Sequence, residues 1–93
     1  MVPRMTNYTV RYDRRAIKAL KKLDPSVSRR IYLWIESNLV DCEDPRLFGS
    51  ALSGPMGEFW KYRIGNYRII ANIEDRNLVI LIVDAGHRSR IYR

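Results

Sequence analysis

The sequence is poor in the residues that build disulfide frameworks and metal sites. Its 93 residues include one cysteine, Cys42, and one histidine, His87. A lone cysteine excludes an internal disulfide, and a single histidine beside it is too little for a zinc cluster. We therefore expect no metal and no other cofactor, and we interpret Cys42 as an inert thiol near a helix end.

Long hydrophobic runs are missing as well. No apolar stretch is long enough to span a bilayer, and residues 1–7 lack the hydrophobic segment of a signal peptide. The chain also contains no internal repeat, linker or low-complexity tract. These absences lead us to expect a single cytoplasmic domain over residues 1–93.

Acidic residues are few in comparison with basic ones. Ten Asp and Glu stand against seventeen Lys and Arg, which gives a formal net charge of +7 and a pI near 10. Because 46% of the residues are hydrophobic, the excess charge belongs to a folded domain rather than to a disordered chain. It predicts a polyanionic partner, either a nucleic acid or an acidic protein segment.

The most informative stretch is residues 59–73, where apolar and basic residues alternate on both sides of Gly65-Asn66. This pattern predicts two antiparallel strands joined by a two-residue type II′ turn, with glycine at its first central position. The resulting register places Arg63 opposite Arg68 and Phe59 opposite Asn72. One face of the hairpin is then apolar and is predicted to be buried: Trp60, Tyr62, Ile64, Tyr67, Ile69, Ala71 and Ile73.

The other face of the hairpin carries Lys61, Arg63 and Arg68. Two arginines directly opposite each other repel by roughly 3 kcal/mol before screening, at about 5 Å and an effective dielectric near 20. Any one of these cations is adequately explained as a solvated surface charge. Three that converge on one face favour an anion site, most naturally for phosphate.

The rest of the chain predicts an α+β fold of order β-α-α-β-β-β. A short strand at 8–12 precedes a helix capped by Asp13, a second helix follows Asp24-Pro25 to about Val40, and the apolar run 78–83 is typical of an interior strand. The expectation is a helical hairpin on one face of a small, mainly antiparallel four-stranded sheet. The residues predicted to pack against the hairpin are Ile17, Leu20, Ile31 and Ile35, and Leu47 and Leu52 are expected to anchor the loop between helices and hairpin.

Two further segments are strongly basic. The exposed side of the first helix holds five cations with no acid between them, a pattern of either a solvated face or a track for a phosphate backbone: Arg14, Arg15, Lys18, Lys21 and Lys22. The tail that follows the interior strand contains Arg88, Arg90 and Tyr92. It is either a frayed terminus or a segment that brings Arg88 and Tyr92 to the cations of the hairpin.

Several segments together resemble the RelE toxin branch of the RelE/ParE superfamily. They are Leu52-Ser53-Gly54, Trp60-Lys61-Tyr62-Arg63-Ile64, Gly65-Asn66-Tyr67-Arg68-Ile69-Ile70 and Gly86-His87-Arg88-Ser89-Arg90-Ile91-Tyr92. The resemblance implies a messenger-RNA endonuclease that enters the ribosomal A site and is silenced by an antitoxin with an acidic, amphipathic segment. Its partners would be that antitoxin, the ribosome and messenger RNA, with no membrane involved.

The same resemblance implies roles for single residues. Lys61 and Arg63 match the two basic residues of the first hairpin strand, with Arg63 where lysine is familiar, and Arg68 matches a phosphate-binding arginine. Arg88 matches the arginine after the last strand and Tyr92 the terminal tyrosine. Tyr92, with Lys61 nearby, would activate the 2′-hydroxyl, while the arginines would hold the phosphate and the leaving oxygen. The expected RNA contacts outside this set are Lys18, Lys21, Lys22 and Arg90.

Two alternatives remain open on the sequence. A toxin of the ParE branch, which poisons DNA gyrase, would keep the fold and the basic surface but need none of the phosphate-site residues. A non-catalytic RNA-binding module would explain the charge, although the chain lacks a recognised RNA-binding signature such as a pair of stacking aromatics on a sheet. His87 is a weak candidate for a general base because it has no second histidine to work with.

Overall fold

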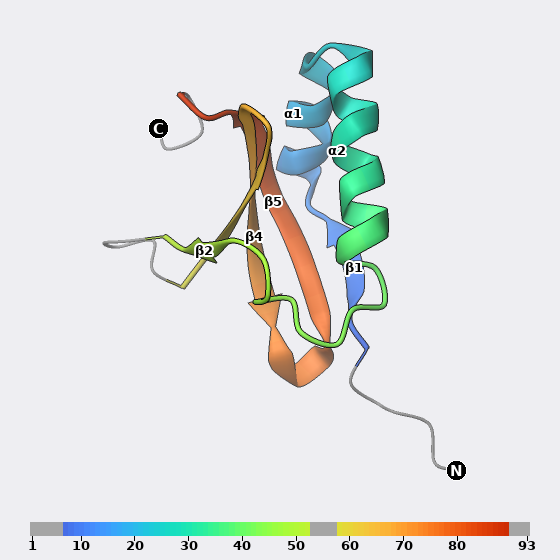
Figure 1. The fold of residues 1–93 in the computed structure, drawn as a ribbon, viewed down its shortest axis with the longest axis vertical. Coiled ribbons are helices and arrows are strands. Elements are labelled where there is room, and N and C mark those ends of the chain that lie inside the picture. The colour runs from blue at the N-terminus through green and yellow to red at the C-terminus, as the bar shows by residue number, and fades with distance from the viewer. Residues whose placement is uncertain (1–6, 53–57, 90–93) are drawn as a thin grey trace.

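The computed structural model describes residues 7–52 and 58–89 as two helices packed on one face of a twisted sheet (Figure 1). The sheet has five strands in the order β1-β5-β4-β3-β2, and within it β1 runs parallel to β5 while the other pairs are antiparallel. The elements are β1 Thr9–Tyr12, α1 Arg14–Lys22, α2 Pro25–Asn38, β2 Ser50–Ala51, β3 Trp60–Ile64, β4 Tyr67–Glu74, the 3₁₀ turn η2 Asp75–Asn77 and β5 Val79–His87.

Both helix starts follow the local signals in the sequence. The Asp13 carboxylate accepts a hydrogen bond from the backbone N–H of Arg15 at 3.2 Å, so it caps α1 as predicted. Pro25 occupies the first turn of α2, where its missing N–H costs nothing. The Ser28 hydroxyl donates to the carbonyl of Leu20 at 2.6 Å, which ties the start of α2 to the last turn of α1. The helical hairpin is therefore closed by a hydrogen bond as well as by packing.

The central hairpin has the predicted register. Ile64 pairs with Tyr67 and Arg63 with Arg68, and Gly65 adopts a φ of 61° while Asn66 lies outside the positive-φ region. That combination is the one a type II′ turn requires. Strand pairing begins at Trp60 with Ala71, so the expected pair of Phe59 with Asn72 lies outside the ladder.

The apolar face of the hairpin packs against the core, as predicted, although Trp60, Tyr67 and Ile73 are half-buried rather than buried. Seven side chains from the two helices and the hairpin have at most 1% of their surface exposed: Ala16, Leu20, Ile31, Ile35, Tyr62, Ile69 and Ala71. Ile80 and Ile82 of β5 extend this core beneath α1. Each large apolar side chain buried in this way contributes roughly 1.5–3 kcal/mol, so the core fixes which face of the sheet remains open.

Three sequence predictions about this core were wrong in detail. Ile17 is 38% exposed, because the short α1 presents Ala16 and Leu20 to β5 and Ile17 lies about 100° round the helix from Ala16. Leu47 is 74% exposed and anchors nothing, whereas Leu52 is buried as expected. Helix α2 ends at Asn38 rather than Val40.

The sheet also differs from the prediction. The two-residue strand β2 adds a fifth strand at the edge beside β3, and two residues are too few to show an alternating pattern. Strand β5 is interior, as expected, but it continues to His87, so Ala85 and Gly86 belong to the sheet rather than to a tail. The first six residues, residues 53–57 and residues 90–93 lie outside the described part of the chain.

Residues 41–49, which we call the strap, cross from the end of α2, beside Tyr8 at the β1 edge of the sheet, to β2 at the other edge (Figure 1). The Tyr62 hydroxyl donates to the carbonyl of Pro45 at 2.6 Å, and Pro45 is itself fully buried. The indole N–H of Trp60 donates to the carbonyl of Phe48, also at 2.6 Å. Two β3 side chains therefore hold the strap, in place of the expected Leu47.

An ion pair joins the strap to η2, at the end of the sheet opposite the β3–β4 turn. The Arg46 guanidinium donates to both carboxylate oxygens of Asp75 at 2.9 and 3.1 Å, and the Tyr8 hydroxyl donates to the same carboxylate at 2.7 Å. Arg46 also lies 5.8 Å from the ring centroid of Trp60. Within the strap, burial raises the pKa of the Cys42 thiol, which fits the inert role expected for it.

Asp75→Asn should lower the stability of the fold at neutral pH and flatten its dependence on pH in acid. Arg46, and after it the Tyr8 hydroxyl, holds the pKa of Asp75 below its ordinary value. Such a carboxylate stabilises the fold fully above its unfolded pKa of about 3.9, and the contribution disappears as the pH falls through the lower folded value. Since the pair is exposed, we expect about 1 kcal/mol or less.

The measurement is urea unfolding between about pH 2 and pH 7. Glu36→Gln, on the exposed side of α2, is the matched control and should follow the wild-type profile. Parallel profiles for Asp75→Asn and the wild-type protein would contradict the role given to this ion pair.

Candidate functional site: a basic face at the end of the sheet

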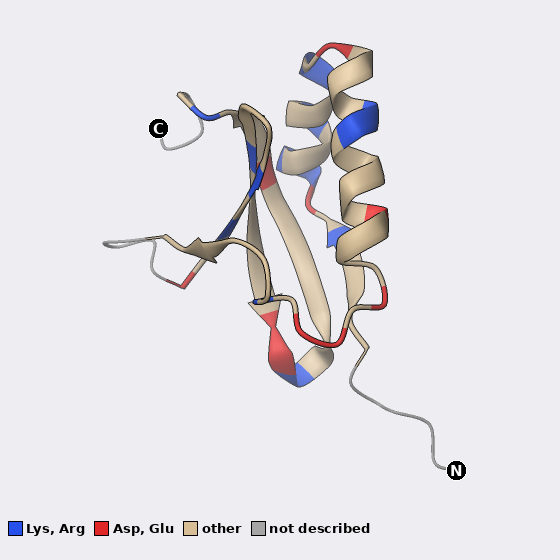
Figure 2. Ribbon diagram, in the orientation of Figure 1, with Lys and Arg blue, Asp and Glu red and all other residues tan. Residues whose placement is uncertain are grey.

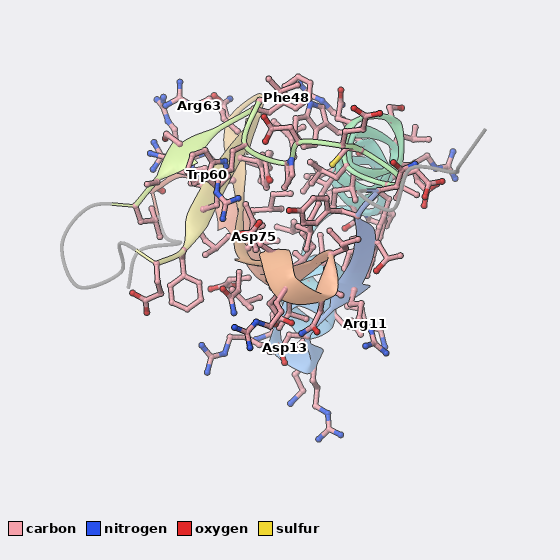
Figure 3. All side chains as sticks on the ribbon, turned by 90° about the horizontal axis from the view of Figure 1, so that it is seen from below. Arg11, Asp13, Phe48, Trp60, Arg63 and Asp75 are labelled. Carbon is pink, nitrogen blue, oxygen red and sulfur yellow. The ribbon has the colours of Figure 1, made fainter. Side chains whose placement is uncertain are left out.

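The three hairpin cations lie on the sheet face that the helices leave open. Lys61 and Arg63 alternate with the buried Tyr62 and Ile64 along β3, and Arg68 stands directly opposite Arg63 on β4. Side chains directly opposite each other in an antiparallel pair share a face. Figure 3 shows Arg63 extending outward, away from α2. We call the surface formed by Lys61, Arg63 and Arg68 the basic face.

Lys61 is held by the neighbouring edge of the sheet. It pairs with Ser50 of β2 on one side and with Ile70 of β4 on the other. Gly49, with a φ of 78°, precedes β2, and a Cβ at this position would collide with the carbonyl oxygen of Lys61. The close approach thus requires glycine, and the strap brings β2 against the strand that carries Lys61 and Arg63.

Beside Arg68 the surface is open. Gly86 of β5 is its partner across the ladder, and a Cβ built at Gly86 would meet no atom within 4 Å. Below this gap, Leu52 and Ile70 form a small apolar cluster with Phe59 and Val83. The basic face therefore combines a cationic end, open space beside an arginine and an apolar patch, which is a surface that suits a phosphate with an attached organic group.

Arg88 lies at the same end of the sheet as the hairpin turn. Its backbone N–H donates to the carbonyl of Asn66 at 2.9 Å, and its side chain is exposed. After β5, the chain leaves the sheet on the side away from the helices (Figure 1). The structure thus brings Arg88 next to the turn between the strands of Arg63 and Arg68. Tyr92 and Arg90, the other predicted residues of the tail, lie outside the described residues.

The described tyrosines with shifted pKa values are unsuited to act as bases in place of Tyr92. Burial raises the pKa of Tyr62 strongly and that of Tyr12 to about 12, and the hydrogen bond to Asp75 raises the pKa of Tyr8. The hydroxyls of Tyr8 and Tyr62 are also already committed as donors. None of these three side chains is therefore suited to activate the 2′-hydroxyl, the role expected for Tyr92.

The helix lysines do not form one patch. Lys18 and Lys22 line a groove of about 510 Å³ together with Arg14, Arg15 and Asp84, near the start of α1. Lys21 instead lines a groove of about 490 Å³ between the two helices, where Leu33 is 59% exposed. Figure 2 shows basic residues on both helices as well as on the hairpin. The predicted RNA contacts on α1 therefore point in two directions.

Arg30 is a cation near the site that the sequence did not reveal. A Cβ at Gly65 would come within 2.6 Å of its Nη2 atom, so the guanidinium of α2 lies over the hairpin turn. Arg30 and Arg63 also line the same hollow of about 370 Å³ between α2 and β3. Helical periodicity could have placed Arg30 on the exposed side of α2, but only the packing of α2 on the hairpin brings it to Gly65.

Comparison with known proteins identifies the class to which this fold and basic face belong. Residues 10–92 match the family profile described as ParE toxin of type II toxin–antitoxin systems. The chain therefore belongs to this toxin family, as a RelE-type member of the RelE/ParE superfamily. Neither helix of the described residues is long and apolar enough to cross a membrane.

The relatives agree with this placement. The chain is 29% identical to toxin RelG of Mycobacterium tuberculosis over 86 residues, which cover 92% of this chain and 97% of RelG. It is 28% identical to the mRNA interferase toxin RelE of Escherichia coli over 86 residues, 89% of this chain and 85% of RelE. Among solved structures it is similar to the M. tuberculosis RelBE2 toxin–antitoxin complex, with a TM-score of 0.81, 26% identity and coverage of 95% of this chain and 99% of that one.

Phosphate should stabilise the protein more than chloride does at equal ionic strength. If an anion on the basic face relieves the repulsion between Arg63 and Arg68, a phosphate concentration ten times its Kd adds about 1.4 kcal/mol to the free energy of unfolding. Arg63→Gln should abolish most of this difference, while Arg76→Gln in η2, at the far end of the sheet, should preserve it. Equal phosphate effects on both variants in thermal unfolding would rule out the basic face as the anion site.

Proposed function

We propose that this toxin is a ribosome-dependent endonuclease that cleaves messenger RNA in the A site. The observation that supports it most directly is the convergence of Lys61, Arg63 and Arg68 on the open face of the sheet, with Arg88 at its end. The name of the similar E. coli protein, an mRNA interferase, points to the same activity.

Cleavage of RNA by its own 2′-hydroxyl requires the protein mainly to supply charged groups in the correct positions. The 2′-hydroxyl of RNA attacks the adjacent phosphate, so the enzyme must remove a proton, stabilise the added negative charge and protonate the leaving 5′-oxygen. In our proposal Arg63 and Arg68 hold the phosphate, and Arg88 assists at the phosphate or the leaving oxygen. Tyr92, with Lys61 nearby, activates the 2′-hydroxyl.

The open gap at Gly86 supports this assignment. A phosphate bound between Arg63 and Arg68 needs room for the ribose on either side, and no atom occupies the space within 4 Å of a Cβ at Gly86. The half-buried Arg68 is more strongly shielded from water than the exposed Arg63, so its charge acts in a lower dielectric. Arg68 is therefore the residue to which we assign the largest share of charge stabilisation.

We further propose that an antitoxin with an acidic, amphipathic segment holds the toxin inactive. The similar M. tuberculosis and E. coli structures are toxin–antitoxin complexes. The hollow between α2 and β3 has apolar Leu33 and Trp34 beside Arg30 and Arg63, so an acidic helix or strand fits it in both polarity and charge. A segment seated there would cover one side of Arg63 and so block the basic face.

The protein should cleave messenger RNA on translating ribosomes and cleave naked RNA very poorly. The cations stabilise charge, but nothing on the described open face holds a flexible RNA in an in-line geometry, so the ribosome must supply that alignment. Toeprinting of a translated message, beside incubation of the same RNA alone, measures both. A DNA gyrase supercoiling assay run in parallel tests the ParE-like alternative, and gyrase inhibition without cleavage would favour that alternative.

Two variants should separate catalysis from binding. Tyr92→Phe removes one hydroxyl, so cleavage should fall by a factor of roughly 10² or more while RNA binding stays the same. Arg68→Ala should also abolish most cleavage, but it should weaken RNA binding and lower its salt dependence because a phosphate contact is lost. Arg76→Ala is the charge-matched control, and wild-type cleavage by Tyr92→Phe would remove that residue from the mechanism.

A further inference from the structure

A second hollow lies behind the basic face, on the helix side of the same end of the sheet. Its volume is about 330 Å³, and it opens between α1 and the last residues of β5. Ala19, Leu23 and Ala85 give it an apolar floor, while Tyr67 and His87 line one side and Lys22 another. None of these residues belongs to the basic face.

The two rings form a built aromatic wall. Tyr67 and His87 are partners across the β4–β5 ladder, and their rings meet edge to face with centroids 5.5 Å apart. Nδ1 of His87 lies 2.9 Å from the Ser89 hydroxyl and accepts from the Ser89 backbone N–H at 3.3 Å. Because a backbone N–H can only donate, the neutral ring carries its proton on Nε2, which remains a donor for a bound group.

The hollow continues into the basic groove of α1. Ala19 and Lys22 line both, and the groove adds the cations Lys18, Arg14 and Arg15. Its acidic lining residues are Asp13, whose carboxylate caps α1, and Asp84. An aromatic pocket of limited size therefore opens onto a track of cations. That pairing suits a planar ring attached to a chain of regularly spaced negative charges.

We propose that this hollow, the base pocket, holds one unstacked nucleobase of a single-stranded RNA whose phosphates follow the basic side of α1. The base would stack on the Tyr67–His87 wall and place its phosphate near Lys22. An acidic peptide would use the lysines and arginines but has no planar group for the aromatic wall. The inference adds a binding site to the proposed nuclease and assigns this pocket no part in the chemical step.

The position of the base pocket connects it with the basic face. Tyr67 and Arg68 are neighbours on β4, as are Gly86 and His87 on β5, and successive strand residues point to opposite faces. Arg88 lies between the two sites at the turn. An RNA that passes round this end of the sheet would meet both sites, so the pocket would bind a nucleotide that flanks the scissile phosphate.

The test is binding of a fluorescein-labelled, fully 2′-O-methylated RNA hexamer, which cannot undergo 2′-hydroxyl attack, followed by anisotropy over a range of salt concentrations. His87→Ala should weaken binding by roughly tenfold, the scale of one lost base–aromatic stack, and His87→Phe should restore most of it. Lys22→Gln should lower the slope of log K against log salt by about 0.7, the value for one phosphate contact on a single strand. Arg76→Gln is the control and should bind like the wild-type protein.

The outcomes separate this inference from the proposed function. Arg63 does not line the base pocket, so the loss caused by His87→Ala should have the same size in an Arg63→Gln background. If the protein cleaves no RNA yet the His87 and Lys22 effects appear, the base pocket stands without the nuclease. If His87→Ala and His87→Phe both bind like the wild-type protein, while Lys22→Gln alone weakens binding, this region binds only the phosphates and no base. That result overturns the proposal.

Discussion

Burial of the apolar side of the β3–β4 hairpin against the two helices is the constraint on which the rest of the structure depends. Tyr62 lies at its centre, with its ring fully buried and its hydroxyl bonded to the Pro45 carbonyl. Because strand side chains alternate, burying Tyr62 and Ile64 necessarily turns Lys61 and Arg63 to the other side. A one-residue shift of register would put the cations into the core, so the fold itself enforces the basic face.

A few contacts of the strap hold the hairpin in this arrangement. Hydrogen bonds from Tyr62 and Trp60 hold the middle of the strap, and the Arg46–Asp75 pair joins it to η2. Gly49 lets the end of the strap lie against the backbone of Lys61. The interactions that stabilise the sheet are therefore also those that position the cations. The packing also holds Arg63 directly opposite Arg68 despite the repulsion between their like charges.

Both faces of one sheet end carry features that suit RNA, and they differ in kind. The open face offers converging positive charge with space beside Arg68, which serves a phosphate whose negative charge increases during reaction. The helix side offers aromatic rings with a cationic track, which serves a base and its backbone. Proposed in this way, the toxin would hold its substrate on two sides of the β3–β4 turn, with Arg88 between them.

The sequence alone determined the strands of the hairpin, their register and the face that carries Lys61, Arg63 and Arg68, because alternation and the Gly65-Asn66 turn are local signals. It also determined the helices and the interior strand, although Ile17 and Leu47 show that hydrophobicity alone does not place a residue in a core. Only the tertiary structure decided that Arg30 lies over Gly65, that Arg46 reaches Asp75 and that His87 faces Tyr67 beside Lys22. These contacts join residues far apart in the chain, and their geometry follows from how α1, α2 and the strap pack on the sheet, which no local pattern encodes.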